Sequence, residues 1–369
     1  MLRDQVRRFV EEKIKPYADA WERDGFTPRS VLREMGALGF FGIRYPAEHG
    51  GAEMDTLASV VLAEELGRST YSGVAITALV HTDMASVHVF NAGSPVQKAR
   101  WMSSIIAGET ITAVAVTEPD AGSDVKAVRT TARRVEGGFV LNGTKLYITN
   151  GVHADLYCVA AKSGSAGPAA KSVTMFLIEK GTPGLRVARQ LDKHGWRSSD
   201  TAELVLEDCF VPAEAVLGEE GHGFYAIMKN FQNERIVLGA MAMGEAQAAL
   251  DLTLDYVRTR KAFGAPLWEK QAVRQKLGML SAKVEAGRQL VHATAWRHAQ
   301  GQNVTREVSM AKAYCGELVN EVMYACLQFH GGSGFMSGMT IERMTRDARV
   351  QAIGGGATEV MLEEVAKRI

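Results

Sequence analysis

Cysteine is scarce in this sequence of 369 residues. The four cysteines are Cys158, Cys209, Cys315 and Cys326, and no two of them have the Cys-x-x-Cys spacing. Their scatter argues against a disulfide framework and against a cysteine-ligated zinc site. We therefore expect reduced, buried thiols in a reducing compartment.

An excess of charge of one sign is also missing. Lysine plus arginine and aspartate plus glutamate both count 42, so the net charge is zero. Without a basic run, we expect no nucleic-acid partner. The N-terminus is charged and no apolar run is recognised as long enough to span a bilayer, so we expect neither a leader nor membrane insertion. A bacterial cytoplasmic protein and a processed protein of the mitochondrial matrix both fit this pattern.

Several familiar catalytic motifs are absent. The sequence contains no Gly-x-Gly-x-x-Gly after a strand, no Walker loop, no Gly-x-Ser-x-Gly elbow and no His-Glu-x-x-His. The nine histidines show no metal-ligand spacing, and we expect no metal. These absences argue against a nicotinamide-dependent Rossmann dehydrogenase, a serine hydrolase and a zinc enzyme.

The periodicity of apolar residues changes twice along the chain. It is helical in the first third, alternating in the middle third and helical again in the last third. This order predicts an α+β protein with an N-terminal helical domain (1–111), a middle antiparallel β-domain (112–220) and a C-terminal domain of long helices (221–369). Strands are expected at 112–116, 155–161, 172–179, 184–189 and 201–208.

Two turns are expected in the middle domain. Asn142-Gly143 separates two apolar runs and predicts a hairpin between 139–141 and 144–148. The small residues at 163–168 predict a loop.

Two polar segments of the middle domain form a distinctive pair. Thr117-Glu-Pro-Asp-Ala-Gly-Ser-Asp124 follows an expected strand, and Tyr147-Ile-Thr-Asn-Gly151 follows further along the chain. Taken alone, the first segment fits an ordinary turn. It also leaves backbone amides and hydroxyls free to hold a phosphate or the polar edge of a ring.

Together, these two segments resemble the flavin and thioester site of the acyl-CoA dehydrogenase family, and the resemblance covers nearly the whole chain. It implies bound FAD and a C-terminal four-helix bundle. Tyr147 stands where a tryptophan that covers one flavin face is commoner, and Thr149 would reach toward flavin N5. The cofactor-binding residues that the resemblance implies here are Val114, Val116, Thr117, Gly122, Ser123, Tyr147, Ile148 and Thr149.

A second set of segments matches the family in the same order. Arg260-Lys-Ala-Phe263-Gly, with Gln271 downstream, resembles the segment whose arginine reaches the FAD pyrophosphate of a neighbouring subunit. Each segment alone could be an ordinary helix end, with a terminal cation or a glycine stop. The remaining cofactor residues that the resemblance implies are Gln328, Gly331, Gly332, Thr358 and Glu359.

The catalytic base of most family members is missing from its usual place. Gly355 stands where their C-terminal glutamate lies, whereas Glu234 lies in a segment similar to that of the long-chain and isovaleryl-CoA enzymes, which have glycine at the other position. A lone helical glutamate is usually a solvated one, but Glu234 has apolar neighbours in sequence. The resemblance implies substrate contacts at Ser123, Tyr225, Gln232, Asn233, Arg235, Gly355 and Gly356.

These observations predict FAD-dependent α,β-dehydrogenation of an acyl-CoA to a trans-2-enoyl-CoA, with Glu234 as the base. The segment at Asp347 resembles the long-chain type more than the isovaleryl type, so long-chain or branched-chain substrates are expected. The resemblance also implies a homotetramer and electron-transfer flavoprotein as the electron acceptor. Two alternatives stay open, an acyl-CoA oxidase that passes electrons to oxygen and a non-catalytic CoA- or flavin-binding paralogue.

Overall fold

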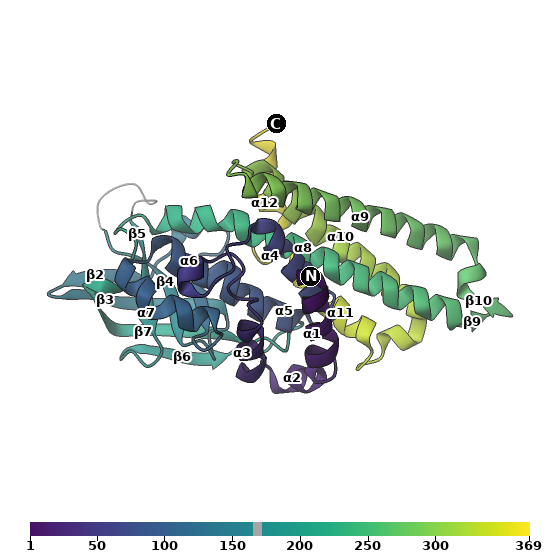
Figure 1. Ribbon diagram of the computed structural model, residues 1–369, viewed down its shortest axis with the longest axis horizontal. Coiled ribbons are helices and arrows are strands. Elements are labelled where there is room, and N and C mark those ends of the chain that lie inside the picture. The colour runs from purple at the N-terminus through teal and green to yellow at the C-terminus, as the bar shows by residue number, and fades with distance from the viewer. Residues whose placement is uncertain (165–171) are drawn as a thin grey trace.

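A computed structural model describes residues 1–164 and 172–369. In chain order, helices precede and follow a set of strands, and these strands lie at one end of the molecule (Figure 1). Two stretches of the N-terminal part are π-helical, η1 (Val10–Ile14) and η3 (Val80–Ala85). The α-helices of this part are α1 (Leu2–Phe9), α2 (Ala18–Asp24), α3 (Arg29–Ala37), α4 (Thr56–Gly67), α5 (Ser72–Leu79), α6 (Ser86–Ala92) and α7 (Pro95–Ile106).

The middle part is one mixed sheet with the order β6-β7-β3-β2-β4-β5-β8. Most neighbours are antiparallel as expected, but β1 pairs with β4 in parallel, and β2 also meets β4 in parallel at one residue pair. The strands are β1 (Thr112–Ala115), β2 (Thr131–Val135), β3 (Gly138–Thr149), β4 (Leu156–Lys162), β5 (Val173–Glu179), β6 (Leu185–Gln190), β7 (Thr201–Pro212) and β8 (Val216–Leu217).

The hairpin predicted at Asn142-Gly143 is wrong. Strand β3 runs straight through these residues, and its hairpin partner β2 is reached through residues 136–137 instead. Asn142 and Gly143 form an irregularity against β7, where a side chain at Gly143 would lie 2.4 Å from Thr130 Oγ1. Glycine is therefore required here for close packing rather than for a turn. Of the loop predicted at 163–168, residues 165–168 lie outside the described residues.

The C-terminal part consists of long helices. Helix α8 (Gly223–Thr259) extends from above the sheet to the far end of the molecule, where a short hairpin, β9 (Lys261–Ala262) and β10 (Ala265–Pro266), follows it (Figure 1). Helices α9 (Gln271–Ala299) and α10 (Thr305–His330) pack along it. Two shorter helices complete this part, α11 (Thr340–Ala348), which the sequence did not predict, and α12 (Thr358–Ala366).

Glycines allow α4 and α8 to cross in close contact. A side-chain carbon at Gly67 would lie 2.3 Å from Met241 O, and one at Gly244 would lie 2.0 Å from Glu64 O. Atoms that are not bonded do not approach this closely, so a side chain at either glycine would force the two helices apart. This crossing holds α8 against the N-terminal helices that face Glu234.

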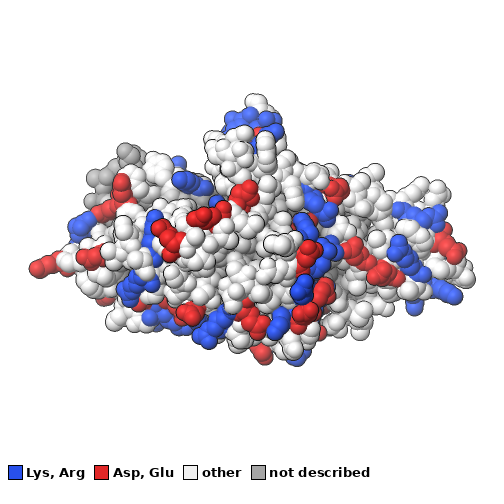
Figure 2. All heavy atoms as spheres, viewed as in Figure 1, with Lys and Arg blue, Asp and Glu red and all other residues white. Residues whose placement is uncertain are grey.

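One apolar stretch is longer than the sequence suggested. By length and composition Ser72–Ala92 could cross a membrane, but 94% of its most apolar window is buried inside the protein, as in a core helix. On the molecular surface, charges of both signs are intermixed over the face shown in Figure 2.

Candidate active site

The two polar segments of the middle part lie side by side. Leu146 N donates to Thr117 O at 2.9 Å, and Lys145 Nζ donates to Val116 O at 3.1 Å. Val114 lies in β1, next to this junction. The structure therefore brings together the residues that the sequence had paired only by resemblance.

A β-bulge exposes the aromatic residue of this site. The pairing of β3 with β7 is interrupted between Lys145 and Ile148, and Tyr147 has a φ of 60°. Bulges of this kind turn a side chain out of the regular alternation. As a result, Tyr147 is 66% exposed while Ile148 is buried, and Thr149 lies half-buried beside them.

A buried ion pair holds the Thr117 loop, and sequence reasoning missed it. Lys145 Nζ lies 2.7 Å from Glu118 Oε1, and both side chains are almost fully buried. Glu118 also accepts hydrogen bonds from the amides of Arg129 and Thr130. Position 145 on an expected strand was a signal, because a lysine in an apolar strand requires a partner.

The surface beyond this loop is open. Gly122 and Ser123 are exposed, and a side-chain carbon built at Gly122 would meet nothing within 4 Å. A flat ring system with polar edges suits this site, which has free space at a glycine, an exposed tyrosine ring and the partly exposed residues Thr117 and Thr149. The residues present therefore fit a flavin.

The second set of predicted cofactor residues lies elsewhere. Arg260 caps the distal end of α8, Phe263 in the following turn is 98% exposed, and Gln271 begins α9. Gln328, Gly331 and Gly332 are exposed near the end of α10. Helix α8 has 37 residues, about 55 Å at its regular rise, and it separates this set from the sheet (Figure 1). One chain therefore cannot bring both sets to one flavin.

Glu234 is a buried carboxylate in the first half of α8. Its side chain is 7% exposed, and Asn230 Nδ2, one turn earlier, donates to its Oε1 at 2.8 Å. Burial raises the pKa of Glu234 to about 7, although the Asn230 hydrogen bond and the Arg235 charge oppose this rise. A carboxyl group with a pKa near neutrality exchanges protons readily at physiological pH.

The glycine turn at Gly355 packs against the same part of α8. A side-chain carbon at Gly355 would lie 2.2 Å from Leu238 Cδ1, and one at Gly356 would lie 3.5 Å from Arg235 Nε. Leu238 follows Glu234 by one helical turn, so both face the same side of α8. Gly355 is itself exposed, and its φ of 67° suits glycine.

The remaining predicted residues lie around this pair. Tyr225 is half-exposed near the start of α8, and Gln232 accepts a hydrogen bond from Val304 N at 3.4 Å. Thr358 begins α12 and donates to Glu317 at 2.7 Å, with exposed Glu359 beside it. Their contacts with cofactor or substrate stay predictions.

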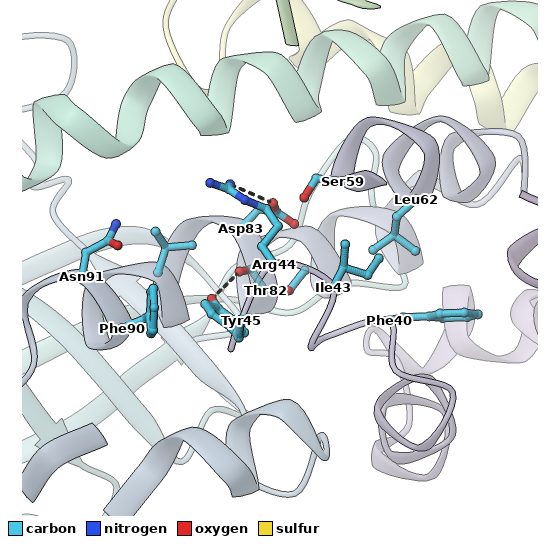
Figure 3. Close-up of a pocket in the computed structure, with 11 residues that line it drawn as sticks. Phe40, Ile43, Arg44, Tyr45, Ser59, Leu62, Thr82, Asp83, Phe90 and Asn91 are labelled. Atoms are coloured by element: carbon cyan, nitrogen blue, oxygen red, sulfur yellow. Dashed lines mark hydrogen bonds and ion pairs between the residues drawn. The ribbon is translucent and has the colours of Figure 1, made fainter. Parts of the chain in front are cut away.

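A polar cluster from three segments lies behind Glu234. Asn233 is buried, donates to Asp83 Oδ1 at 3.2 Å and accepts from Arg44. Figure 3 shows Arg44 facing Asp83 beside a cavity of about 50 Å³ that Ser59 also lines. Asn233, predicted to contact substrate, thus has its amide engaged within the protein. Asp83 and Arg44 were not predicted, because only the fold brings them to α8.

The fold and the site together define the class of FAD-dependent oxidoreductases that enclose a β-sheet between two helical parts. Models of the N-terminal, middle and C-terminal domains of acyl-CoA dehydrogenases match residues 1–109, 113–209 and 221–369. The chain belongs to the acyl-CoA dehydrogenase family. It is an oxidoreductase, and FAD is its cofactor.

Individual relatives agree with this assignment. The chain is 37% identical over its whole length to the mitochondrial long-chain specific acyl-CoA dehydrogenase of Rattus norvegicus, covering 86% of that protein. It is 36% identical to the mitochondrial isovaleryl-CoA dehydrogenase of Oryza sativa, covering 97% of this chain and 88% of that one.

Solved structures extend the agreement to three dimensions. The crystal structure of a putative acyl-CoA dehydrogenase from Mycobacterium smegmatis is 38% identical, with a TM-score of 0.96 over 99% of this chain and 96% of that one. An FAD complex of PigA is 27% identical, with a TM-score of 0.95 over 100% and 96% of the two chains.

Proposed function

We propose that this enzyme oxidises an acyl-CoA thioester to a trans-2-enoyl-CoA, with Glu234 as the base that removes the α-proton. The observation that carries the proposal is the position of the Glu234 carboxylate. It is buried, it shares one face of α8 with Leu238, and Leu238 contacts the Gly355 turn. Gly355 stands where most of the family has its glutamate, so both segments border the same space.

The hydrogen bonding of Glu234 indicates which oxygen takes the proton. Asn230 Nδ2 occupies Oε1, so Oε2 is the oxygen left for the substrate. A thioester α-proton is weakly acidic, and its removal requires a base close to it and a donor near the carbonyl oxygen as charge develops there. The amide of Gly355 is such a donor in this proposal.

The cofactor sits on the middle part of the chain in this proposal. Thr117, Ser123 and Thr149 bond its polar edges, and Tyr147 covers one face. When bound, FAD supplies the oxidant that takes the β-hydrogen with its electron pair. The protein residues hold the reacting carbons between this face and Glu234, and a closed site excludes water.

The substrate class is proposed from both residues and relatives. Leu79, Val80 and Met84 are buried on α5 and η3 and provide an apolar wall suited to an acyl chain. The relatives act, by their names, on long-chain and isovaleryl-CoA thioesters. We therefore propose long-chain or branched-chain acyl-CoA as substrate.

The assembly is proposed to be a homotetramer. The exposed residues near Arg260 and Gln328 are too far from the sheet of their own chain, so in this proposal they complete the FAD site of a neighbouring subunit. Electron-transfer flavoprotein is the proposed acceptor. Relatives include mitochondrial enzymes and two from Bacillus subtilis, and a mitochondrial matrix or bacterial cytoplasm is proposed accordingly.

The test is anaerobic addition of a panel of straight and branched acyl-CoAs to the yellow holoenzyme. Bleaching of the flavin by long or branched chains, with an enoyl-CoA recovered, is the expected result. Hydrogen peroxide formed in air as fast as an artificial dye is reduced would favour the oxidase. A flavin that no acyl-CoA bleaches would favour the non-catalytic paralogue.

A further inference from the structure

Lys312 is a buried lysine with no role in the mechanism proposed for Glu234. It lies on α10, is 2% exposed and donates from Nζ to Gln351 O at 2.5 Å and to Gly356 O at 3.3 Å. Throughout residues 1–164 and 172–369, it forms no ion pair with a carboxylate. A buried ammonium group without an anion is costly, so the protein has a reason to keep it.

The two carbonyls that Lys312 binds bracket the glycine turn. Gln351 lies before Gly354 and Gly355, and Gly356 lies after them, so one ammonium group ties both ends of the turn. The stem of the lysine also reaches the turn itself, because a side-chain carbon at Gly355 would lie 3.7 Å from Lys312 Cε. The position of the Gly355 backbone therefore depends on Lys312.

The amide of Gly355 is free within the described part of the chain. Ile353 N and Gly354 N both donate to Val350 O at 2.8 Å, whereas no protein acceptor among these residues receives the Gly355 N–H. Gly355 is exposed and borders Leu238, one turn from Glu234. A free backbone donor at the wall of a buried base can bond an oxygen that gains negative charge.

The ammonium group remains largely charged at neutral pH. Burial and, to a lesser extent, the nearby Arg235 charge lower the pKa of Lys312 to about 8, while Cys315 and Glu317 oppose the shift. A positive charge behind the free amide favours an anion in front of it. Two of its three N–H groups have carbonyl acceptors, and the third has none among the described residues.

We propose that Lys312 is a positioning residue for enolisation: it fixes the 351–356 turn so that the Gly355 amide meets the thioester oxygen, and its charge stabilises the enolate. The α-proton moves to Glu234 Oε2, and the electron pair of the C–H bond becomes the enolate. Lys312 neither gains nor loses a proton. This inference rests on the proposed function of the same site.

The test measures the acidity of a bound ligand rather than turnover. Acetoacetyl-CoA, with 3-ketohexadecanoyl-CoA as a longer probe, is titrated with pH on the FAD-loaded Glu234→Gln protein, and enolate formation is followed by absorbance. The Gln variant removes the titration of the base from the signal. Lys312→Met in this background should raise the ligand pKa by about one unit, a tenfold loss of acidity.

Two variants serve as controls. Lys312→Arg keeps the charge and should restore most of the acidity. Lys193→Met removes another lysine whose backbone partner, Ser199 O at 2.5 Å, does not belong to the 351–356 turn, and it should leave the ligand pKa unchanged. FAD content and melting temperature show whether each variant folds.

The possible results distinguish failure of the Lys312 proposal from failure of the proposed function. If Glu234→Gln alone does not lower the ligand pKa below its value in water, the site does not stabilise an enolate and the proposed function fails. If it does lower it, and Lys312→Met changes nothing, the role of Lys312 is overturned. Lys312→Gln replaces the Met variant if that one unfolds. If neither folds while Lys193→Met does, Lys312 is a structural group and the proposal is wrong.

Discussion

At the scale of single residues, the site depends on opposing effects at Glu234. Burial raises its pKa, and the Asn230 amide lowers it by favouring the ionised carboxylate, with a result of about 7. A glutamate carboxylate exposed to water has a lower pKa and would accept an α-proton less readily. In the proposed mechanism, Asn230 therefore sets the fraction of Glu234 that is ionised at neutral pH.

The first prediction follows from this balance. Asn230→Ala removes a hydrogen bond to the charged form, so the pKa of Glu234 should rise by about one unit. Because only the ionised carboxylate accepts a proton, the rate of flavin reduction by acyl-CoA should reach half its maximum at a higher pH. Stopped-flow reduction from pH 6 to 9 measures the shift.

A control on the same helix keeps this prediction specific. Gln247 bonds Asp251 and Arg288 and lies 13 residues beyond Glu234 on the same helix. Gln247→Ala should leave the pH profile unchanged. An Asn230→Ala profile that coincides with that of the unmodified enzyme would show that the amide does not tune the base.

At the scale of elements, the sequence predicted most helices and strands and failed at particular places. The helical periodicity of the last third predicted a domain of long helices, and α8, α9 and α10 are those helices, because long periodic patterns are the most readily recognised. Asn142-Gly143 has the composition of a hairpin turn, but its glycine serves the contact with Thr130, a partner that local sequence does not reveal. The π-helical turn η3, which presents Asp83, leaves no local pattern either.

An ion-pair cluster joins helices α1, α4 and α9. Glu64 on α4 is 2% exposed, and it contacts Arg3 of α1 at 3.0 Å and Arg288 of α9 at 2.6 Å. Burial alone would raise its pKa, but His292, 3.5 Å away, and both arginines bring the pKa of Glu64 to about 2. A carboxylate with a lowered pKa stabilises the fold above its unfolded pKa and loses this effect as the pH falls toward 2.

The second prediction concerns this cluster. Glu64→Gln removes the buried anion that Arg3 and Arg288 both contact, and it should lower the free energy of unfolding at pH 7 by about 3 kcal/mol. Between about pH 5 and pH 2 the difference from the unmodified protein should shrink, because the glutamate itself becomes protonated. Urea unfolding at pH 7 and at pH 3 measures both values.

Glu285 supplies the matched control, since it pairs with the same Arg288 at 2.7 Å but is 52% exposed. Glu285→Gln should change stability by less than about 1 kcal/mol. Equal losses of unfolding free energy in the two variants would mean that burial does not increase the contribution of Glu64 to stability.

At the scale of the whole molecule, the two sets of predicted cofactor residues lie toward opposite ends of α8 (Figure 1). Which parts of the site could be predicted from the sequence depends on whether their residues lie in contiguous motifs. Contiguous motifs such as 117–124 and 147–151 were recognisable, and so was the exchange of a glutamate between positions 355 and 234. Partners from distant segments, such as Arg44, Asp83 and Lys312, were not, because only the packed fold brings them to Glu234.

The third prediction tests the proposed sharing of the cofactor between subunits. Arg260→Ala should weaken both FAD retention and assembly, because a ligand that bridges two subunits stabilises their contact. Flavin absorbance per chain and the mass in solution measure the two effects. Arg258→Ala, also exposed near the end of α8, is the control. An Arg260→Ala monomer with full FAD occupancy would contradict the arrangement.

The central claim is that Glu234 removes the α-proton, and the most direct measurement is stopped-flow reduction of the flavin by saturating acyl-CoA. Glu234→Gln should still bind FAD and acyl-CoA, while its reduction rate falls by a factor of at least about a hundred. Glu245→Gln is the control, since Glu245 is a second buried carboxyl on α8, bonded to Gln351 at 3.2 Å, and burial raises its pKa to about 8. The account predicts near-normal reduction in the control. Reduction of Glu234→Gln at the rate of the unmodified enzyme would contradict it.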